Sequence, residues 1–164
     1  MNTSSMNLPY AEEIGHYWMT GNKTPADSWM DKTKDLIKEA GGRVIADAFG
    51  NQAGQAAFLL EFEIGEDRFK VIWPVLPTKS KNEKAARIQA VTMLHHDVKA
   101  KCMTATVMGT RAAFFSYLLL PDGRPATSAS VRELETGIPA LFKMSAYQQL
   151  GEGEEHIMEG EIVG

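Results

Sequence analysis

The sequence predicts an α+β fold in which a three-stranded antiparallel sheet is covered by one long helix. Apolar residues recur at helical spacing over residues 25–40. They alternate with polar residues over 43–75, where the runs are separated by turns that contain glycine. Helical spacing returns over about 82–107, which indicates a long helix after the strands. Two N-terminal helices and short C-terminal helices complete the prediction.

The chain length of 164 residues predicts one domain, which we place at residues 1–150. A domain of this size can bury a core without disulfides or metals. Residues 151–164 hold five acidic residues and no basic one, which is typical of a mobile acidic tail. Such a tail could compete with nucleic acid for a basic surface or recruit a basic protein partner.

The first expected helix covers residues 7–19, with Pro9 in its first turn. The second expected helix begins with Thr24 as N-cap and Pro25 in the first helical position, and it ends at Gly41-Gly42. Its expected buried stripe comprises Trp29, Met30, Thr33, Leu36, Ile37 and Ala40.

The three expected strands cover about 43–49, 55–64 and 67–75, and a Gly65-Glu66 turn joins the last two. One register puts every apolar pair on one face and both opposite-charge pairs on the other, which predicts a sheet with one buried face. The expected pairs are Glu63 with Arg68, Phe62 with Phe69, Glu61 with Lys70, Leu60 with Val71, and Phe58 with Trp73.

The long helix is expected to begin at a capping box formed by Ser80 and Glu83 and to end near Gly109. Six residues of small or apolar type fall within about 80° on a helical wheel, so this stripe should pack on the sheet. They are Ile88, Val91, Leu94, Val98, Cys102 and Ala105. A turn at 121–124 and a short helix near 128–137 follow.

The main functional clue is the uneven distribution of charge. Residues 68–111 contain nine basic and two acidic residues, a net charge of +7, in a chain whose total is −4. The overall negative charge argues against nucleic-acid binding by the whole surface. Any site for an anion must therefore be local.

The basic side chains concentrate at the start of the long helix. Lys84 and Arg87 share the angular sector of the apolar stripe, so we expect them to lean toward the sheet, beside the third strand with Lys70 and Trp73. A strand, a basic turn and a helix start, whose free N–H groups suit phosphate, would then border one groove. The candidate nucleic-acid-binding residues are Lys79, Lys81, Lys84, Arg87, Lys70, Arg68, Lys99, Lys101, Arg111 and Trp73.

Two alternatives stay open for these residues. Basic clusters are commonly solvated surfaces in which the side-chain stems cover apolar area, and this interpretation has equal weight here. Trp73 and Phe69 could stack on unpaired bases, but their place on the apolar face of the hairpin favours a core role.

Catalysis has little support in the sequence, and we expect neither a cofactor nor a metal. His95-His96-Asp97 is the one constellation that resembles a site, but adjacent helical residues point about 100° apart and cannot chelate one ion together. We expect one histidine to be buried or hydrogen-bonded and the other solvated. Glu61 and Glu63 could serve a metal-dependent nuclease, yet the expected register pairs them with basic residues.

The cellular compartment is predicted from the single cysteine, Cys102, which cannot form an internal disulfide. A reducing cytoplasm is the natural place for such a chain. The N-terminus resembles no signal peptide, and no apolar run approaches the ~20 residues that span a bilayer.

Residues 84–142 resemble a group of small proteins encoded by phages and bacterial mobile elements, in VKAK at 98–101, LLLPDGRPA at 118–126 and GIPALF at 137–142. No activity is established for that group. Three antiparallel strands followed by a long helix with a basic start are also similar to the core of phage single-strand annealing proteins. Those annealing proteins are ring or helical oligomers that hold single-stranded DNA in a basic groove between sheet and helix.

These observations together predict a non-catalytic homo-oligomer that binds single-stranded nucleic acid. The resemblance adds annealing activity and a role in recombination or replication of a mobile element. A structural or regulatory protein-interaction module of a phage is the alternative, and a metal-dependent nuclease is the least favoured one.

Overall fold

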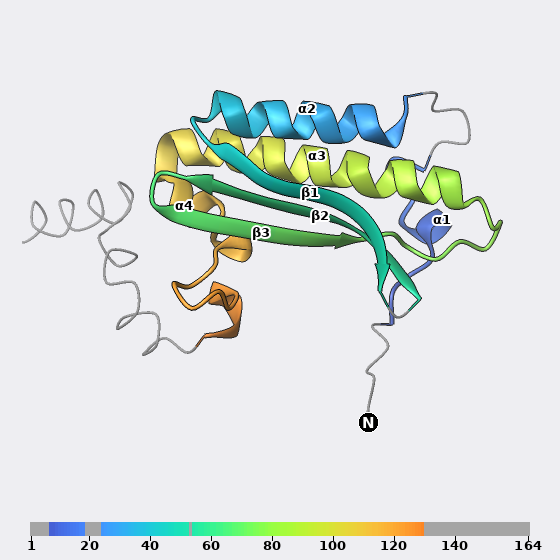
Figure 1. Ribbon diagram of the computed structural model, residues 1–164. Coiled ribbons are helices and arrows are strands. Elements are labelled where there is room, and N and C mark those ends of the chain that lie inside the picture. The colour runs from blue at the N-terminus through green and yellow to red at the C-terminus, as the bar shows by residue number, and fades with distance from the viewer. Residues whose placement is uncertain (1–6, 19–23, 53, 130–164) are drawn as a thin grey trace, which may run out of the picture.

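The computed structural model describes residues 7–18, 24–52 and 54–129. Figure 1 shows an α+β arrangement in which three strands form one antiparallel sheet and the helices precede and follow it. The elements in chain order are α1 (Ala11–Ile14), α2 (Ala26–Glu39), β1 (Arg43–Gln52), β2 (Gln55–Ile64), β3 (Asp67–Pro74), α3 (Glu83–Met108), α4 (Thr110–Ala113), η1 (Phe115–Tyr117) and η2 (Ala126–Ser128). The predicted fold class is confirmed.

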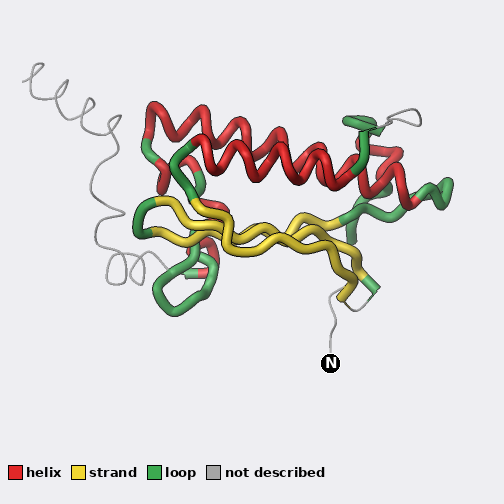
Figure 2. The backbone as a smooth tube through the Cα atoms, turned by 45° about the horizontal axis from the view of Figure 1, so that its top comes forward, coloured by secondary structure: helices red, strands yellow, loops and turns green. Residues whose placement is uncertain are grey.

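The sheet has the order β1-β2-β3, and α2 and α3 lie side by side over one of its faces. Figure 2 shows these two layers, with the helices on one side of the sheet. The starts of α2 and α3, the short α1 and the end of β1 all lie at one end of the molecule (Figure 1). That end carries the candidate site.

The predicted register of the β2–β3 hairpin is confirmed, because Phe62 lies opposite Phe69 and Glu63 lies opposite Arg68. Because successive side chains of a strand point to opposite faces, every second side chain of β2 and β3 faces the helices. The buried members of this set are Phe58, Leu60, Phe62, Phe69 and Val71, and Trp73 is half-buried against the same core. Phe114 closes this core, with its ring centroid 5.5 Å from those of Phe62 and Phe69.

The ion pairs on the outer face differ from the expected cross-strand pairs. Arg68 reaches diagonally to Glu61, with 2.5 Å between Nη2 and Oε1. Glu63 instead pairs at 2.6 Å with Arg43, its register partner on β1. Glu61 and Glu63 therefore form cross-strand salt bridges and lie opposite Lys70 and Arg68 as expected, but each ion pair joins a basic residue other than that register partner. The sequence of the hairpin alone does not show that Arg43 of β1 competes with Arg68 for Glu63.

The predicted stripe of α3 packs on the sheet. Ile88, Val91, Leu94 and Val98 are buried, whereas Cys102 is only partly buried where the helix approaches its end. The helix stops at Gly109, whose φ of +87° favours glycine and prevents simple continuation. The turn at 121–124 also forms as predicted, with the Gly123 N–H donating to the Leu120 carbonyl.

Several predicted boundaries were wrong. The first helix is one turn, Ala11–Ile14, because Gly15 adopts a left-handed conformation directly after it. Pro25, and not Thr24, occupies the N-cap position of α2. β1 continues for three residues past Phe49 because Gly50 to Gln52 remain paired with β2. Ala40 is exposed, so it does not belong to the buried stripe of α2.

The start of α3 differs from the predicted capping box. Asn82 is the N-cap, and its Oδ1 accepts a hydrogen bond of 3.1 Å from the Ala85 N–H. Ser80 lies two residues earlier, where its hydroxyl donates to Glu12 of the N-terminal segment. Ser80 is therefore part of the turn before the helix and contacts a residue far away in the sequence.

The expected helix near 128–137 and the expected acidic tail at 151–164 lie outside the described residues, apart from Ser128 and Ala129. In the part of the chain that the structure describes, no helix combines the length and apolar character that crossing a membrane requires.

Candidate nucleic-acid interface

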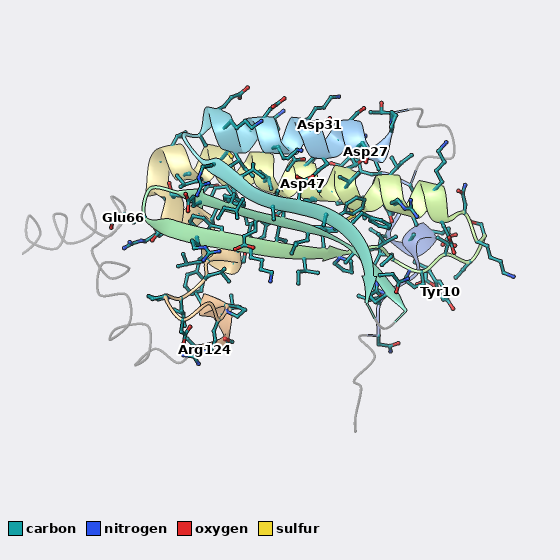
Figure 3. All side chains as sticks on the ribbon, in the orientation of Figure 1. Tyr10, Asp27, Asp31, Asp47, Glu66 and Arg124 are labelled. Carbon is teal, nitrogen blue, oxygen red and sulfur yellow. The ribbon has the colours of Figure 1, made fainter. Side chains whose placement is uncertain are left out.

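Two open hollows adjoin at the N-terminal end of α3, with volumes of about 850 Å³ and 530 Å³. Both are lined by Phe49, Glu83 and Arg87, so we treat them as one groove, the α3-start groove. The larger hollow extends along the β1–β2 turn and the segment that follows β3, and the smaller one extends to the start of α2. Figure 3 labels Asp27, a lining residue of the smaller hollow, at the start of α2.

The centre of the groove is a stacked pair of one basic and one aromatic side chain. The Arg87 guanidinium carbon lies 4.2 Å from the ring centroid of Phe49, which is cation–π geometry. Phe49 remains 41% exposed, and its ring also contacts the buried ring of Phe58, with centroids 4.9 Å apart. The pair is therefore fixed to the core on one side and accessible to solvent on the other.

The secondary structure explains how this pair forms. Phe49 lies opposite Phe58 on the face of the sheet that carries the core. Arg87 is in the second turn of α3 beside the buried Ala86 and Ile88, so its backbone is held close to the sheet. The predicted lean of Arg87 toward the sheet is confirmed, but the strand that it meets is β1.

The groove contains three basic residues, Lys81, Lys84 and Arg87, all of them exposed. Two acidic residues, Asp27 and Glu83, line it as well, so its lining carries a net charge of +1. Local positive charge is thus modest, and the Phe49–Arg87 pair distinguishes this groove more than charge does.

The remaining predicted site residues lie elsewhere. Arg68 and Lys70 alternate with the buried Phe69 and Val71, so they occupy the face of the sheet away from α3. Trp73 is half-buried against the core and does not line the groove. The expectation of a groove beside β3 with Lys70 and Trp73 was therefore wrong.

Other members of the predicted set have structural partners. Lys79 pairs with Glu13 at 2.8 Å and lies over the Tyr10 ring. Lys101 pairs with Asp97 at 3.0 Å, and Arg111 pairs with Asp67 at 2.6 Å. Lys99 is exposed within α3, away from the groove lining. The cluster predicted from the sequence is thus reduced to Lys81, Lys84 and Arg87.

Sequence reasoning missed Phe49 as a site residue. It chose Phe69 and Trp73 as possible stacking residues, but Phe69 is fully buried. The available signal was the position of Phe49 at the end of the first expected strand, directly before the glycine-containing turn.

The two adjacent histidines pack the N-terminal elements onto α3. His95 Nδ1 lies 3.2 Å from the Thr33 hydroxyl oxygen of α2, and burial, followed by the nearby His96 and Lys99, lowers the pKa of His95. His96 stacks on Tyr17, with ring centroids 4.7 Å apart and an interplanar angle of 5°. Within residues 7–18, 24–52 and 54–129, no group of three or more His, Cys, Asp or Glu side chains is placed to hold a metal ion.

The groove and sheet define a two-layer α+β domain with a basic, aromatic groove at one end. Comparison of the chain with models of protein families, with curated proteins and with solved structures gives no match. The resemblance to mobile-element proteins and to annealing proteins therefore stays a prediction.

Proposed function

We propose that the protein binds single-stranded nucleic acid in the α3-start groove, without catalysing a reaction. The observation that carries this proposal is the exposed Phe49–Arg87 pair in a hollow that also presents Lys81 and Lys84. Proteins that bind single strands combine aromatic or guanidinium surfaces, on which bases stack, with basic groups that follow the phosphates.

The proposed roles follow from the side-chain chemistry. An unpaired base stacks against the Phe49–Arg87 pair, since every base has a flat π-face. Lys81 and Lys84, on the two sides of Arg87 in the groove lining, contact the phosphates before and after that base. A duplex keeps its bases paired and stacked internally, so it offers phosphates but no base for this pair.

The sequence supports a wider role for single-strand binding by this protein. A homo-oligomer would place several grooves along one strand, which is the arrangement that annealing of complementary strands needs. The resemblance to mobile-element proteins supports a role in recombination or replication, and the single Cys102 supports a cytoplasmic location.

A second candidate function is a protein-interaction module. It is favoured by the outer face of the sheet, where Ile72 is 60% exposed and pairs with Leu59. Exposed apolar side chains on this face, which no helix of the described residues covers, are suited to a protein partner. This function would need neither the groove nor nucleic acid.

The test is an anisotropy titration of the whole chain with a labelled oligonucleotide longer than the roughly 4–16 nucleotides that one such site covers. We expect the single strand to bind at least about tenfold more tightly than the duplex of the same sequence, because base stacking contributes about 1–3 kcal/mol per base. Binding should weaken with salt and be unchanged by EDTA.

Other outcomes contradict the proposal. No binding of either oligonucleotide at low salt would favour the protein-interaction module. Hydrolysis that needs a divalent ion would favour the nuclease. Equal affinity for single strand and duplex would indicate charge attraction without a stacking site.

A further inference from the structure

The turn before α3 binds a carboxylate from the N-terminal segment. Oε1 of Glu12 accepts hydrogen bonds from the Lys79 N–H at 3.0 Å, the Ser80 N–H at 3.0 Å and the Ser80 hydroxyl at 2.9 Å. Oε2 accepts a further bond from the Lys79 N–H at 3.1 Å. Two successive backbone amides and one hydroxyl thus converge on a single anionic group.

This geometry is that of an anion-binding concavity. Successive backbone N–H groups that point to one side of a turn bind phosphates as well as carboxylates, because both present charged acceptor oxygens. Lys81, directly after the two amides, adopts a φ of +59°, which bends the turn around the bound group. The donors belong to the turn and precede the N-cap of α3, Asn82, whose side chain already caps the helix.

The group in this concavity is an anion at neutral pH. Burial raises the pKa of the Glu12 carboxyl, but the hydrogen bonds from the Ser80 and Lys79 amides lower it more, to about 2. Glu12 is therefore ionised when it occupies the turn.

The N-terminal segment does not depend on Glu12 alone for its position. The Ala11 N–H donates to the Pro77 carbonyl at 2.8 Å. The buried Gln89 amide donates to the carbonyls of Ala11 at 3.0 Å and His16 at 3.1 Å. The Glu12 side chain can consequently leave the turn while the backbone around α1 stays on α3.

The turn adjoins the proposed nucleic-acid groove. Thr78 and Lys81, the residues on either side of the two amide donors, line the larger hollow. Asn7 and Leu8 of the N-terminal segment line the same hollow. An anion in the turn would therefore lie next to a strand bound in the groove.

We propose that the turn formed by residues 78–81 is a phosphate-binding site that Glu12 occupies as an internal competitor. A backbone phosphate of the bound strand displaces the Glu12 side chain and takes its hydrogen bonds from Lys79 and Ser80. That the phosphate belongs to a nucleic-acid strand rests on the proposed function. The anion site does not depend on that function, since free phosphate has the same acceptor oxygens and can be tested alone.

The first test is a titration of the 15N-labelled full chain with inorganic phosphate, observed at the Lys79 and Ser80 amides. In Glu12→Ala the vacated donors should bind phosphate at least about tenfold more tightly than in the wild type, because no carboxylate competes. Glu13→Ala is the matched control, since it removes the neighbouring negative charge that pairs with the Lys79 ammonium group and leaves Glu12 in place. It should behave like the wild type.

Each outcome of this titration either supports or refutes the phosphate site. If Glu12→Ala and Glu13→Ala gain phosphate affinity equally, general loss of negative charge explains the gain and the site is refuted. No shift of the two amides in Glu12→Ala also refutes it. Should Glu12→Ala release α1, Glu12→Gln retains the side-chain volume without the charge, and it must still bind phosphate more tightly than the wild type.

The second test uses a single-stranded oligonucleotide in place of phosphate. Glu12→Ala should bind the strand several-fold more tightly than Glu13→Ala does, and Ser80→Ala introduced into Glu12→Ala should reverse part of that gain. Phosphate binding without any oligonucleotide binding would refute the proposed function but not the anion site. Oligonucleotide binding with equal affinity in both variants would refute the displacement of Glu12.

Discussion

Replacing Lys81, Lys84 and Arg87 together by alanine is expected to weaken single-strand binding roughly a hundredfold at about 0.1 M salt. Each phosphate contact on a single strand contributes about −0.7 to the slope of log affinity against log salt, so the contacts of Lys81 and Lys84 contribute about −1.4. Loss of the stacking surface of Arg87 weakens binding further, by about 1 kcal/mol or more, without changing the slope. The triple variant should therefore flatten the measured slope by about 1.4. Anisotropy titrations at several salt concentrations give both quantities.

The control for this variant removes the same charge outside the groove. Lys38, Lys70 and Lys99 are exposed and do not line it. Changing these three to alanine should leave most of the affinity intact. Equal losses in the two triple variants would mean that long-range charge, and no site, attracts the strand. No loss in either would mean that Lys81, Lys84 and Arg87 form a solvated face.

Replacing Phe62 by alanine is expected to lower the free energy of unfolding by about 3–5 kcal/mol. Phe62 is fully buried, and its ring centroid lies 5.2 Å from that of Phe69 and 5.5 Å from that of Phe114. Truncation therefore removes apolar burial and leaves a cavity that the surrounding rings cannot fill. Urea denaturation followed by circular dichroism measures the change.

Ile72→Ala is the matched control for the core variant. Ile72 lies on β3 but points away from the helices and is 60% exposed, so we expect a loss below about 1 kcal/mol. If Ile72→Ala destabilised the protein as much as Phe62→Ala, the outer face of the sheet would be covered and the assignment of faces would be contradicted.

The register of the β2–β3 hairpin was predictable because it depends on residues that are close together in the sequence. The turn at Gly65-Glu66 fixes the register, and a shift by one residue would turn Phe62 and Phe69 toward solvent. The stripe of α3 was predictable for a similar reason, since a 3.6-residue period specifies one buried side over many turns. Both inferences needed only residues that are close in the sequence.

β1 and the groove depended on contacts that a local pattern does not contain. An irregularity between Val44 and Ala46 shifts the pairing of β1 with β2, so counting from Arg43 does not give the face on which Phe49 lies. The contact of Phe49 with Arg87 also requires α3 to cross the end of β1. The sequence pattern indicated only that Arg87 leans toward some strand.

The turn before α3 shows the same limit. Ser80 and Glu83 have the spacing of a capping box, yet Ser80 donates to Glu12, which lies 68 residues earlier. Because the Ser80 hydroxyl donates to Glu12, the N-cap of α3 is Asn82, whose Oδ1 accepts from the Ala85 N–H. A pairing over that distance between one glutamate and a serine leaves no periodic trace in a single sequence.

The central claim is that a single strand occupies the α3-start groove, and mapping the bound strand on the 15N-labelled protein tests it most directly. We expect the largest amide shifts at Phe49, at Arg87 and in the turn 78–81, with saturation at the affinity measured by anisotropy. Shifts confined to the outer face of the sheet around Lys70 and Ile72, or no shifts at saturating oligonucleotide, would contradict the claim.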